Sequence, residues 1–293
     1  MTHCYKLYIM SKISVVITAC NAEKYISETV ESVLKQSFAD FELIAVHAGS
    51  TDKTLSVIRS FADKRIRLID SSHPDRFESL NEGIKASTGK YIVVLDAGSI
   101  LHVDMLKLHF SVMEEHPEIT ICGSTEIVFG KKMPKKMVEP KMTGWVDLPL
   151  VELLIDDGIV SPAYMVRRAF INKHNLFYEN FSRAEDYKFW IETALLNSGF
   201  YMDSQPLVYR RIMDEKISSV HRLDKLKNVS KIKNQLLPVL CEKYSETYPS
   251  LTTLNNACIA LSDQKLISEN DIFYLFHTLF MKNKDSFTSL LTN

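Results

Sequence analysis

Short apolar runs alternate with amphipathic stretches along the N-terminal third of the chain. Continuous apolar runs predict buried strands at residues 13–17, 41–46, 66–69 and 91–95. Between them, apolar residues three or four positions apart predict helices, and Asn21 stands at the expected N-cap of the first helix. Such alternation is typical of right-handed βαβ crossovers, so we expect an α/β fold with a mostly parallel, doubly wound sheet.

The pattern changes further along the chain. Single elements are still predicted, namely a helix at 103–115, a strand at 118–129, a strand at 159–166, a helix at 185–196 and a strand at 206–212. Residues 131–141 contain five Lys and two Pro without periodicity, which predicts a solvated loop or, alternatively, a mobile basic lid over an anionic ligand. Beyond them, the pattern divides the chain into an α/β domain over 1–213 and a C-terminal helical region over 214–293.

Parallel sheets bind ligands outside the carboxyl ends of their strands. The informative residues are therefore those that follow the four predicted strands, at 18–21, 47–52, 71–75 and 96–99. The turn after the first strand, residues 18–22, contains no glycine, which argues against a dinucleotide-binding oxidoreductase, and no P-loop sequence occurs in the chain. The sheet therefore predicts a ligand site of another kind.

Five segments carry motifs in a distinctive order. They are Ile13–Ala22 with its Asn-bearing turn, Ser32–Ile44, the Gly-Ser-Thr-Asp loop of Gly49–Thr54, Asn81–Asp96, and Ala184–Trp190 with its Glu-Asp pair. Together these segments resemble the family 2 glycosyltransferases, which have the A-type nucleotide-diphospho-sugar fold, a Rossmann-like architecture. The resemblance runs from Ile13 to about Arg211.

This resemblance implies an inverting glycosyltransferase that moves a sugar from a nucleotide-diphosphate donor to a glycan or lipid-linked acceptor, with a UDP-sugar as the first candidate donor. It implies Asp186 as the general base, with Glu185 beside it, because the acceptor hydroxyl must lose a proton as it attacks. At the start of a predicted helix, Asp186 lies near the positive helix end, which favours its ionised form. The donor-binding residues that it implies are Thr18, Asn21, His47, Gly49, Ser50, Asp96 and Ser99.

The donor side departs from the family pattern in two places. Val46–Ser50 reads Val-His-Ala-Gly-Ser where an acidic pair is usual, and Leu95–Ser99 reads Leu-Asp-Ala-Gly-Ser, which keeps only the first of the usual acids. Because Mg²⁺ or Mn²⁺ on a donor diphosphate normally needs carboxylate ligands, Asp96 predicts a weak metal site, with the Ser99 hydroxyl as a poor helper. Met213 stands near the position of a metal-binding His in the family.

Other side chains could replace the charge of the metal. Lysines of residues 131–141, or Arg210 and Arg211, could bind the diphosphate, although one solvated and one paired arginine is the ordinary alternative. His47 could contact the nucleotide or a metal, or be a satisfied polar residue at a strand end. Trp145 could stack on a sugar or simply pack.

The same departures favour an alternative function. A catalytically degenerate relative would bind nucleotide or glycan, or would scaffold other transferases, without turnover. Loss of the acids near residues 47–48 and 98–99 favours this interpretation, whereas the retained Glu185-Asp186 pair opposes it.

Composition and charge narrow the cellular setting. Lys and Arg total 35 against 36 acids, and a formal net charge of −1 argues against a nucleic-acid partner. Five scattered cysteines and the lack of an apolar signal segment predict a cytoplasmic protein. The C-terminal helices combine lysines, such as Lys227 and Lys231, with aromatic residues. Packing is their default role, with peripheral contact at the inner face of a membrane or homodimerisation as alternatives.

Overall fold

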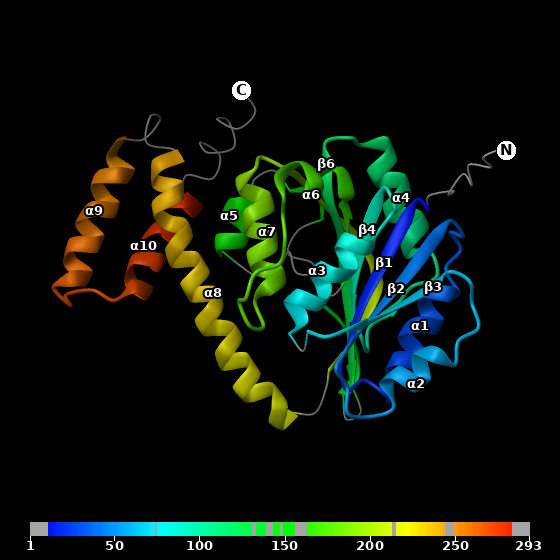
Figure 1. Ribbon diagram of the computed structural model, residues 1–293. Coiled ribbons are helices and arrows are strands. Elements are labelled where there is room, and N and C mark those ends of the chain that lie inside the picture. The colour runs from blue at the N-terminus through cyan, green and yellow to red at the C-terminus, as the bar shows by residue number, and fades with distance from the viewer. Residues whose placement is uncertain are drawn as a thin grey trace, which may run out of the picture.

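The computed structural model shows one sheet with helices on both faces and further helices at the C-terminal end (Figure 1). It describes residues 11–73, 75–130, 133–138, 143–146, 149–155, 163–212, 215–243 and 249–282. The ten described strands are β1 (Ile13–Ala19), β2 (Phe41–Ala48), β3 (Ile66–Ser71), β4 (Tyr91–Asp96), β5 (Ile100–Leu101), β6 (Ile119–Gly130), β7 (Met133–Met137), β8 (Gly144–Val146), β9 (Ala163–Arg167) and β10 (Gly199–Ile212). Their order is β3-β2-β1-β4-β9-β6-β10-β5, with β7 paired to β6 and β8 paired to β10.

The mostly parallel sheet that the βαβ alternation predicts is confirmed. β3, β2, β1 and β4 run parallel to one another, as do β6 and β10, and β9 lies antiparallel between β4 and β6. In this register, Thr18 of β1 lies opposite Val46 on one side and Asp96 on the other. The carboxyl ends of β1, β2 and β4 therefore meet at one edge of the sheet, hereafter the carboxyl edge.

Helices cover both faces of the sheet because strand side chains alternate between two apolar cores. The helices are α1 (Ile26–Leu34), α2 (Thr54–Arg59), α3 (Arg76–Ala86), α4 (Met105–Glu115), α5 (Pro149–Ile155), α6 (Arg168–His174) and α7 (Glu185–Leu195). Val15 and Ile17 of β1 pack in the core of α1, α2 and α4, whereas Val16 packs in the core of α3, α5, α6 and α7. All three side chains are fully buried, which explains the continuous apolar run that predicts this strand.

The region after β10 is helical, as the sequence predicts. It forms α8 (Glu215–Lys243), α9 (Pro249–Asp263) and α10 (Glu269–Lys282). α8 contacts α7, α10 contacts α5, and α9 packs on α8 away from the sheet (Figure 1). Ile232 and Leu236 of α8 and Phe276 of α10 are buried in the same apolar core as Trp190 of α7. These helices therefore share a core with the α/β part. No helix in the described part of the chain is both long and apolar enough to cross a membrane.

Two predicted element boundaries are wrong. α1 begins at Ile26, and Asn21 precedes it in a left-handed conformation (φ +50°), so Asn21 is not its N-cap. β10 begins at Gly199 rather than at residue 206. The sequence pattern missed its first half because the pairing with β6 is irregular between Asp203 and Pro206, where the apolar pattern is interrupted.

Segment 131–141 is not simply a loop. Its residues Met133–Met137 form β7, which pairs antiparallel with the last residues of β6 and so lies toward the carboxyl edge. Val138 follows β7, and residues 131–132 and 139–141 lie outside the described part of the chain, as do Met213 and the first four residues of the strand predicted at 159–166.

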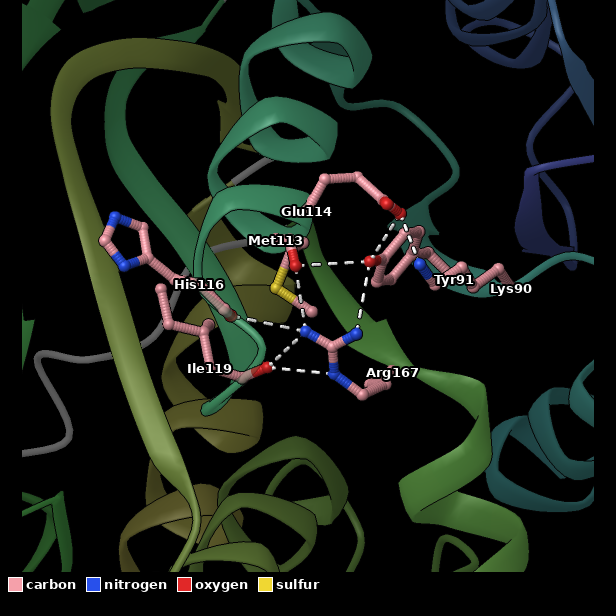
Figure 2. A network of polar contacts seen from close by, with 7 residues as sticks. All are labelled: Lys90, Tyr91, Met113, Glu114, His116, Ile119 and Arg167. Carbon is pink, nitrogen blue, oxygen red and sulfur yellow. Dashed lines mark hydrogen bonds and ion pairs between the residues drawn. The ribbon is translucent and has the colours of Figure 1, made fainter.

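An arginine fastens the opposite edge of the sheet (Figure 2). Arg167 ends β9, and its guanidinium donates to the backbone carbonyl oxygens of Met113 (2.9 Å) and Ile119 (3.0 Å) and to the Tyr91 hydroxyl (3.2 Å). Tyr91 in turn donates to Glu114 (2.8 Å). Because the last carbonyls of a helix have no partner within it, the guanidinium also completes the end of α4. The network holds the last residue of β9 against its neighbours at the edge of the sheet opposite the carboxyl edge.

Candidate active site

An arginine joins two of the predicted site residues, Asp96 and Asp186. Asp96 ends β4, Asp186 lies in the first turn of α7, and Arg76 is the first residue of α3. Nη2 of Arg76 lies 2.8 Å from Oδ1 of Asp96 and 3.0 Å from Oδ2 of Asp186. The structure therefore brings the donor-side acid and the candidate base together through one guanidinium group.

Arg76 keeps part of its hydrogen-bonding capacity unused. Its Nη1 atom is buried, lies 3.9 Å from Oε2 of Glu185 and makes no hydrogen bond with any described residue. The side chain as a whole is 29% exposed, so part of it is open to solvent. Sequence patterns did not single out Arg76, because an arginine in the first turn of an amphipathic helix is usually a surface residue. Its place directly after residues 71–75, which follow a strand, was the available signal.

Two tyrosines hold the carboxylate of Asp186. The Tyr164 hydroxyl donates to Oδ1 of Asp186 (3.3 Å) and is also hydrogen-bonded to the Tyr178 hydroxyl. Tyr178 is buried and stacks on Phe189 of α7, with ring centroids 4.8 Å apart. The side-chain amide of Asn81 in α3 binds the backbone N–H and C=O of Tyr178 at 2.8 and 2.9 Å. β9, α3 and α7 thus fix the orientation of Asp186 together.

Burial determines the acid–base character of the two adjacent acids. Burial raises the pKa of Asp186, and the charge of Asp96 raises it further, whereas Arg76 lowers it. Burial likewise raises the pKa of Glu185, and Arg76 opposes the change. For Asp186 these effects run against the ionising influence expected from the helix end. A carboxylate with a raised pKa accepts a proton more readily, which suits a general base.

The loops after β1 and β2 are tied to each other beside this cluster. The backbone N–H of Asn21 donates to Oγ of Ser50 (3.1 Å), and Oδ1 of Asn21 accepts from the backbone N–H of Thr51 (2.9 Å). Asn21 and Gly49 have left-handed backbones, with φ of +50° and +60°, which Asn and Gly adopt at the least cost. Thr18 lies half-buried at the end of β1. Four predicted donor residues are thus gathered at the carboxyl edge.

His47 is a structural member of this loop. Its Nδ1 atom lies 2.7 Å from Oδ1 of Asp70, and its Nε2 atom accepts the backbone N–H of Ser50 (3.0 Å). This pattern requires a neutral ring with its proton on Nδ1, and it uses both ring nitrogens. In this structure neither ring nitrogen is open to a nucleotide or a metal, because Asp70 and Ser50 engage both. The satisfied strand-end residue is the interpretation that fits.

The residues present do not fit a divalent metal ion. Ser99 is only 3% exposed, and its backbone N–H donates to the Asp96 carbonyl oxygen (3.0 Å), so it shapes a turn rather than assisting a metal. Gly98 has φ +109°, a conformation strained for a residue with a side chain. Asp96 is already paired with Arg76. In the described part of the chain, no group of three or more His, Cys, Asp or Glu is placed to hold a metal.

The basic residues singled out in the sequence are mostly paired elsewhere. Arg210 binds Glu126 through two hydrogen bonds of 2.7 and 2.5 Å, and Arg211 binds Glu28 at 2.7 Å. The expectation that one of these arginines is solvated and unpaired is therefore wrong. Among the lysines of residues 131–141, Lys135 lies in β7 with its ammonium group 5.3 Å from the centre of the Tyr209 ring.

Trp145 lies far from this cluster. It belongs to β8 and pairs with Tyr201 near the start of β10, and β10 is three strands across the sheet from β4. Its ring packs edge-on against His116, with centroids 5.4 Å apart. A packing role fits this position, whereas stacking on a sugar bound near Asp186 does not.

Comparisons with known proteins agree with this geometry. The model of glycosyl transferase family 2 matches residues 14–176. An uncharacterized glycosyltransferase of Haemophilus influenzae is 30% identical over 235 residues, which make up 76% of this chain and 72% of that protein. WfgD of Escherichia coli, a UDP-Glc:alpha-D-GlcNAc-diphosphoundecaprenol beta-1,3-glucosyltransferase, is 26% identical over 217 residues, or 72% of this chain and 83% of that protein.

Solved structures show the same fold. Residues 1–349 of TarS from Staphylococcus aureus, in complex with UDP-GlcNAc, are similar with a TM-score of 0.64 and 20% identity, over 80% of this chain and 73% of that chain. The mannosyltransferase PcManGT from Pyrobaculum calidifontis, in complex with GDP-Man and Mn²⁺, has a TM-score of 0.59 and 14% identity, over 97% of this chain and 85% of that chain. The A-type fold that the sequence motifs imply is confirmed.

Proposed function

Because the chain belongs to glycosyl transferase family 2 and is thus a glycosyltransferase with a nucleotide-sugar donor, we propose that it catalyses inverting transfer with Asp186 as the general base. The observation that carries this assignment is the position of Asp186. It lies in the first turn of a rigid helix, oriented by Tyr164 and joined through Arg76 to Asp96 at the carboxyl edge. The side chain of Glu185, beside it, is more deeply buried, and its Oε2 atom lies 3.9 Å from Nη1 of Arg76.

In the proposed reaction, the acceptor oxygen attacks the anomeric carbon of the donor sugar. The carboxylate of Asp186 takes the hydroxyl proton as the new carbon–oxygen bond forms. The bond between the anomeric carbon and the diphosphate oxygen breaks, and the nucleoside diphosphate leaves with that electron pair. Attack opposite the leaving group inverts the configuration. The chain must supply positive charge or hydrogen-bond donors to the departing diphosphate.

We propose a UDP-sugar donor and a lipid-linked acceptor. Two relatives support a uridine donor, since WfgD is named for UDP-Glc and TarS is in complex with UDP-GlcNAc. WfgD is also named for a diphosphoundecaprenol-linked acceptor, and it is similar to 72% of this chain. A lipid-linked acceptor would place the protein at the cytoplasmic face of a membrane. Exposed Leu223 and Leu226 of α8, with Lys227 beside them, form a surface suited to an anionic lipid headgroup layer.

The test is Asp186→Asn in an assay of UDP release, with UDP-Glc and UDP-GlcNAc as donors and a synthetic GlcNAc-diphospholipid as acceptor. Loss of a general base typically lowers the rate about 10²- to 10⁴-fold, so we expect kcat to fall by that factor while UDP affinity is kept. Asp271→Asn is the matched control, because Asp271 also lies in the first turn of a helix, α10, but is remote from the site. Turnover that survives Asp186→Asn would refute the assignment.

One observation favours the alternative of a non-catalytic binding protein. The acids usual in the family at residues 47–48 and 98–99 are replaced by His47, Ala48, Gly98 and Ser99. UDP binding by the wild-type protein, without turnover on any donor and acceptor pair, would support that alternative.

A further inference from the structure

We propose that the guanidinium group of Arg76 receives the donor diphosphate in the place that a divalent metal ion holds in metal-dependent relatives, so that donor binding needs no metal. This inference rests on the proposed function, because it assigns the cation at that same donor site. The ligand is a nucleoside diphosphate. The planar guanidinium group of an arginine can donate two parallel hydrogen bonds to phosphate oxygens.

The first argument is the lack of a metal donor set at the carboxyl edge. Asp96 is the single acid kept from the usual motif, and its Oδ1 atom is 2.8 Å from Nη2 of Arg76. Gly98 (φ +109°) bears no ligand and donates its backbone N–H to Oγ1 of Thr29 (2.8 Å). Ser99 is buried in the turn. A hard cation would find a single acid in this turn, Asp96, whose carboxylate already shares Nη2 of Arg76 with that of Asp186.

The second argument is the geometry of Arg76 itself. The residue begins α3, where the backbone N–H groups of the first turn and the helix dipole also favour an anion. The two carboxylates of Asp96 and Asp186 occupy only Nη2, while the buried Nη1 atom makes no hydrogen bond with any described residue. An unsatisfied buried donor of a charged group is costly, and a phosphate oxygen would satisfy it.

A second guanidinium group stands near the same acid. Arg210 is held by Glu126 through two hydrogen bonds, and its pKa is raised chiefly by Glu126 and further by the charge of Asp96. The charges of Arg210 and Asp96 therefore interact, whereas Arg76 is the arginine in direct contact with Asp96. Arg210 is 40% exposed and fixed in place, so it adds positive potential to the site without being its main phosphate contact.

The arrangement also connects the donor to the base. Phosphate oxygens bound to Nη1 would draw on the same guanidinium charge that binds Asp186, whose Oδ2 atom is 3.0 Å from Nη2. Donor binding would therefore weaken the hold of Arg76 on Asp186. Because Arg76 lowers the pKa of Asp186, the carboxylate would become a stronger base as the donor arrives.

The experiment is calorimetric titration of the full-length protein with UDP, in EDTA and again with Mn²⁺. The variants are Arg76→Met, Arg76→Lys and the control Arg65→Met. The Arg65 side chain is 26% exposed, against 29% for Arg76, and it is likewise paired with an acid, Asp63. It precedes β3, however, at the opposite edge of the sheet. Melting temperatures establish that each variant is folded. Because Arg76→Lys keeps the charge, it isolates the guanidinium geometry if the methionine variant does not fold.

We expect the wild-type protein to bind UDP equally well in EDTA and in Mn²⁺. Relative to the wild type, UDP affinity should fall about 10- to 100-fold in Arg76→Met and less in Arg76→Lys, and it should be unchanged in Arg65→Met. UDP binding that appears only with Mn²⁺ would overturn the inference and leave the proposed function standing. Full affinity of Arg76→Met in EDTA would do the same. If UDP does not bind the wild-type protein in either condition, the proposed UDP-sugar donor fails, and this inference fails with it.

Discussion

Replacing Arg167 by Met should destabilise the protein strongly and leave its donor chemistry intact. Arg167 donates through Nε and Nη2 to the carbonyl oxygen of Ile119 at 3.1 and 3.0 Å, to that of Met113 at 2.9 Å, and to the Tyr91 hydroxyl at 3.2 Å (Figure 2). Met113, Ile119 and Tyr91 are fully buried. The methionine side chain would fill similar space but offer no donor to these groups.

The size of the effect follows from the groups that lose a hydrogen bond. Each buried polar group that loses its partner costs about 1–3 kcal/mol, and these costs are not fully additive within one network. The Ile119 oxygen loses the guanidinium group, whereas the Met113 oxygen keeps the Tyr91 hydroxyl (3.2 Å) and that hydroxyl keeps Glu114 (2.8 Å). We therefore expect the free energy of unfolding to fall by about 2–4 kcal/mol. Since about 1 kcal/mol shifts the melting temperature of a protein near this size by roughly 2–4 °C, the melting temperature should fall by roughly 10 °C.

The assay is urea unfolding followed by circular dichroism, with calorimetric UDP titration of the same samples below the transition. Arg65→Met again serves as the control, because Arg65 bonds mainly to the side chain of Asp63 and to one backbone carbonyl oxygen, that of Leu34. Its loss should therefore cost only about 1 kcal/mol. An unfolding free energy of Arg167→Met within 1 kcal/mol of the control would refute this reading of the network. Weaker UDP binding at unchanged stability would show instead that this edge of the sheet acts on the donor site.

Two further predictions concern pH and membranes. Burial raises the pKa of both Asp186 and Glu185, so the folded protein binds protons at a higher pH than the unfolded chain does. These two groups therefore favour folding at low pH, and they lose that contribution as the pH rises through their folded pKa values. Urea midpoints measured from pH 4 to 8 should therefore fall less steeply with rising pH in Glu185→Gln than in the wild type, and an unchanged slope would contradict this. The exposed Leu223 and Leu226 beside Lys227 predict co-sedimentation with phosphatidylglycerol vesicles at low salt, lost in Leu223→Ser/Leu226→Ser, and retention of the wild type in the supernatant would remove the membrane proposal.

The first four strands and the parallel sheet were predictable because their residues are buried on both faces. Val15, Val16 and Ile17 leave no polar position, and such runs predict a covered parallel strand without reference to any partner. β7 offered no such signal. Its Met-Pro-Lys-Lys-Met sequence is exposed over residues 134–137, and it is a strand because the backbone of β6 pairs with it.

The site was predictable only where one residue carries the signal. The motifs indicated Asp96 and Asp186, and the fold places both at the carboxyl edge. The role of His47 depends on Asp70, which lies in the neighbouring strand β3, and no local pattern connects the two. Arg76 depends on two acids from β4 and α7, and these meet only once the sheet and helices have assembled. Pairings of this kind belong to the tertiary structure.

The missing acid and the arginine at this site are physically related. A divalent ion on Asp96 would compete with Arg76 for the same carboxylate, and two cations so close together would repel each other. Regaining an acid at Gly98 would force a residue with a side chain into φ +109°, at a cost of about 1–3 kcal/mol. The backbone turn and the guanidinium group therefore both favour a donor site built on arginine. On this reasoning, a single substitution that restores the family's acid would not restore a dependence on metal while Arg76 is present.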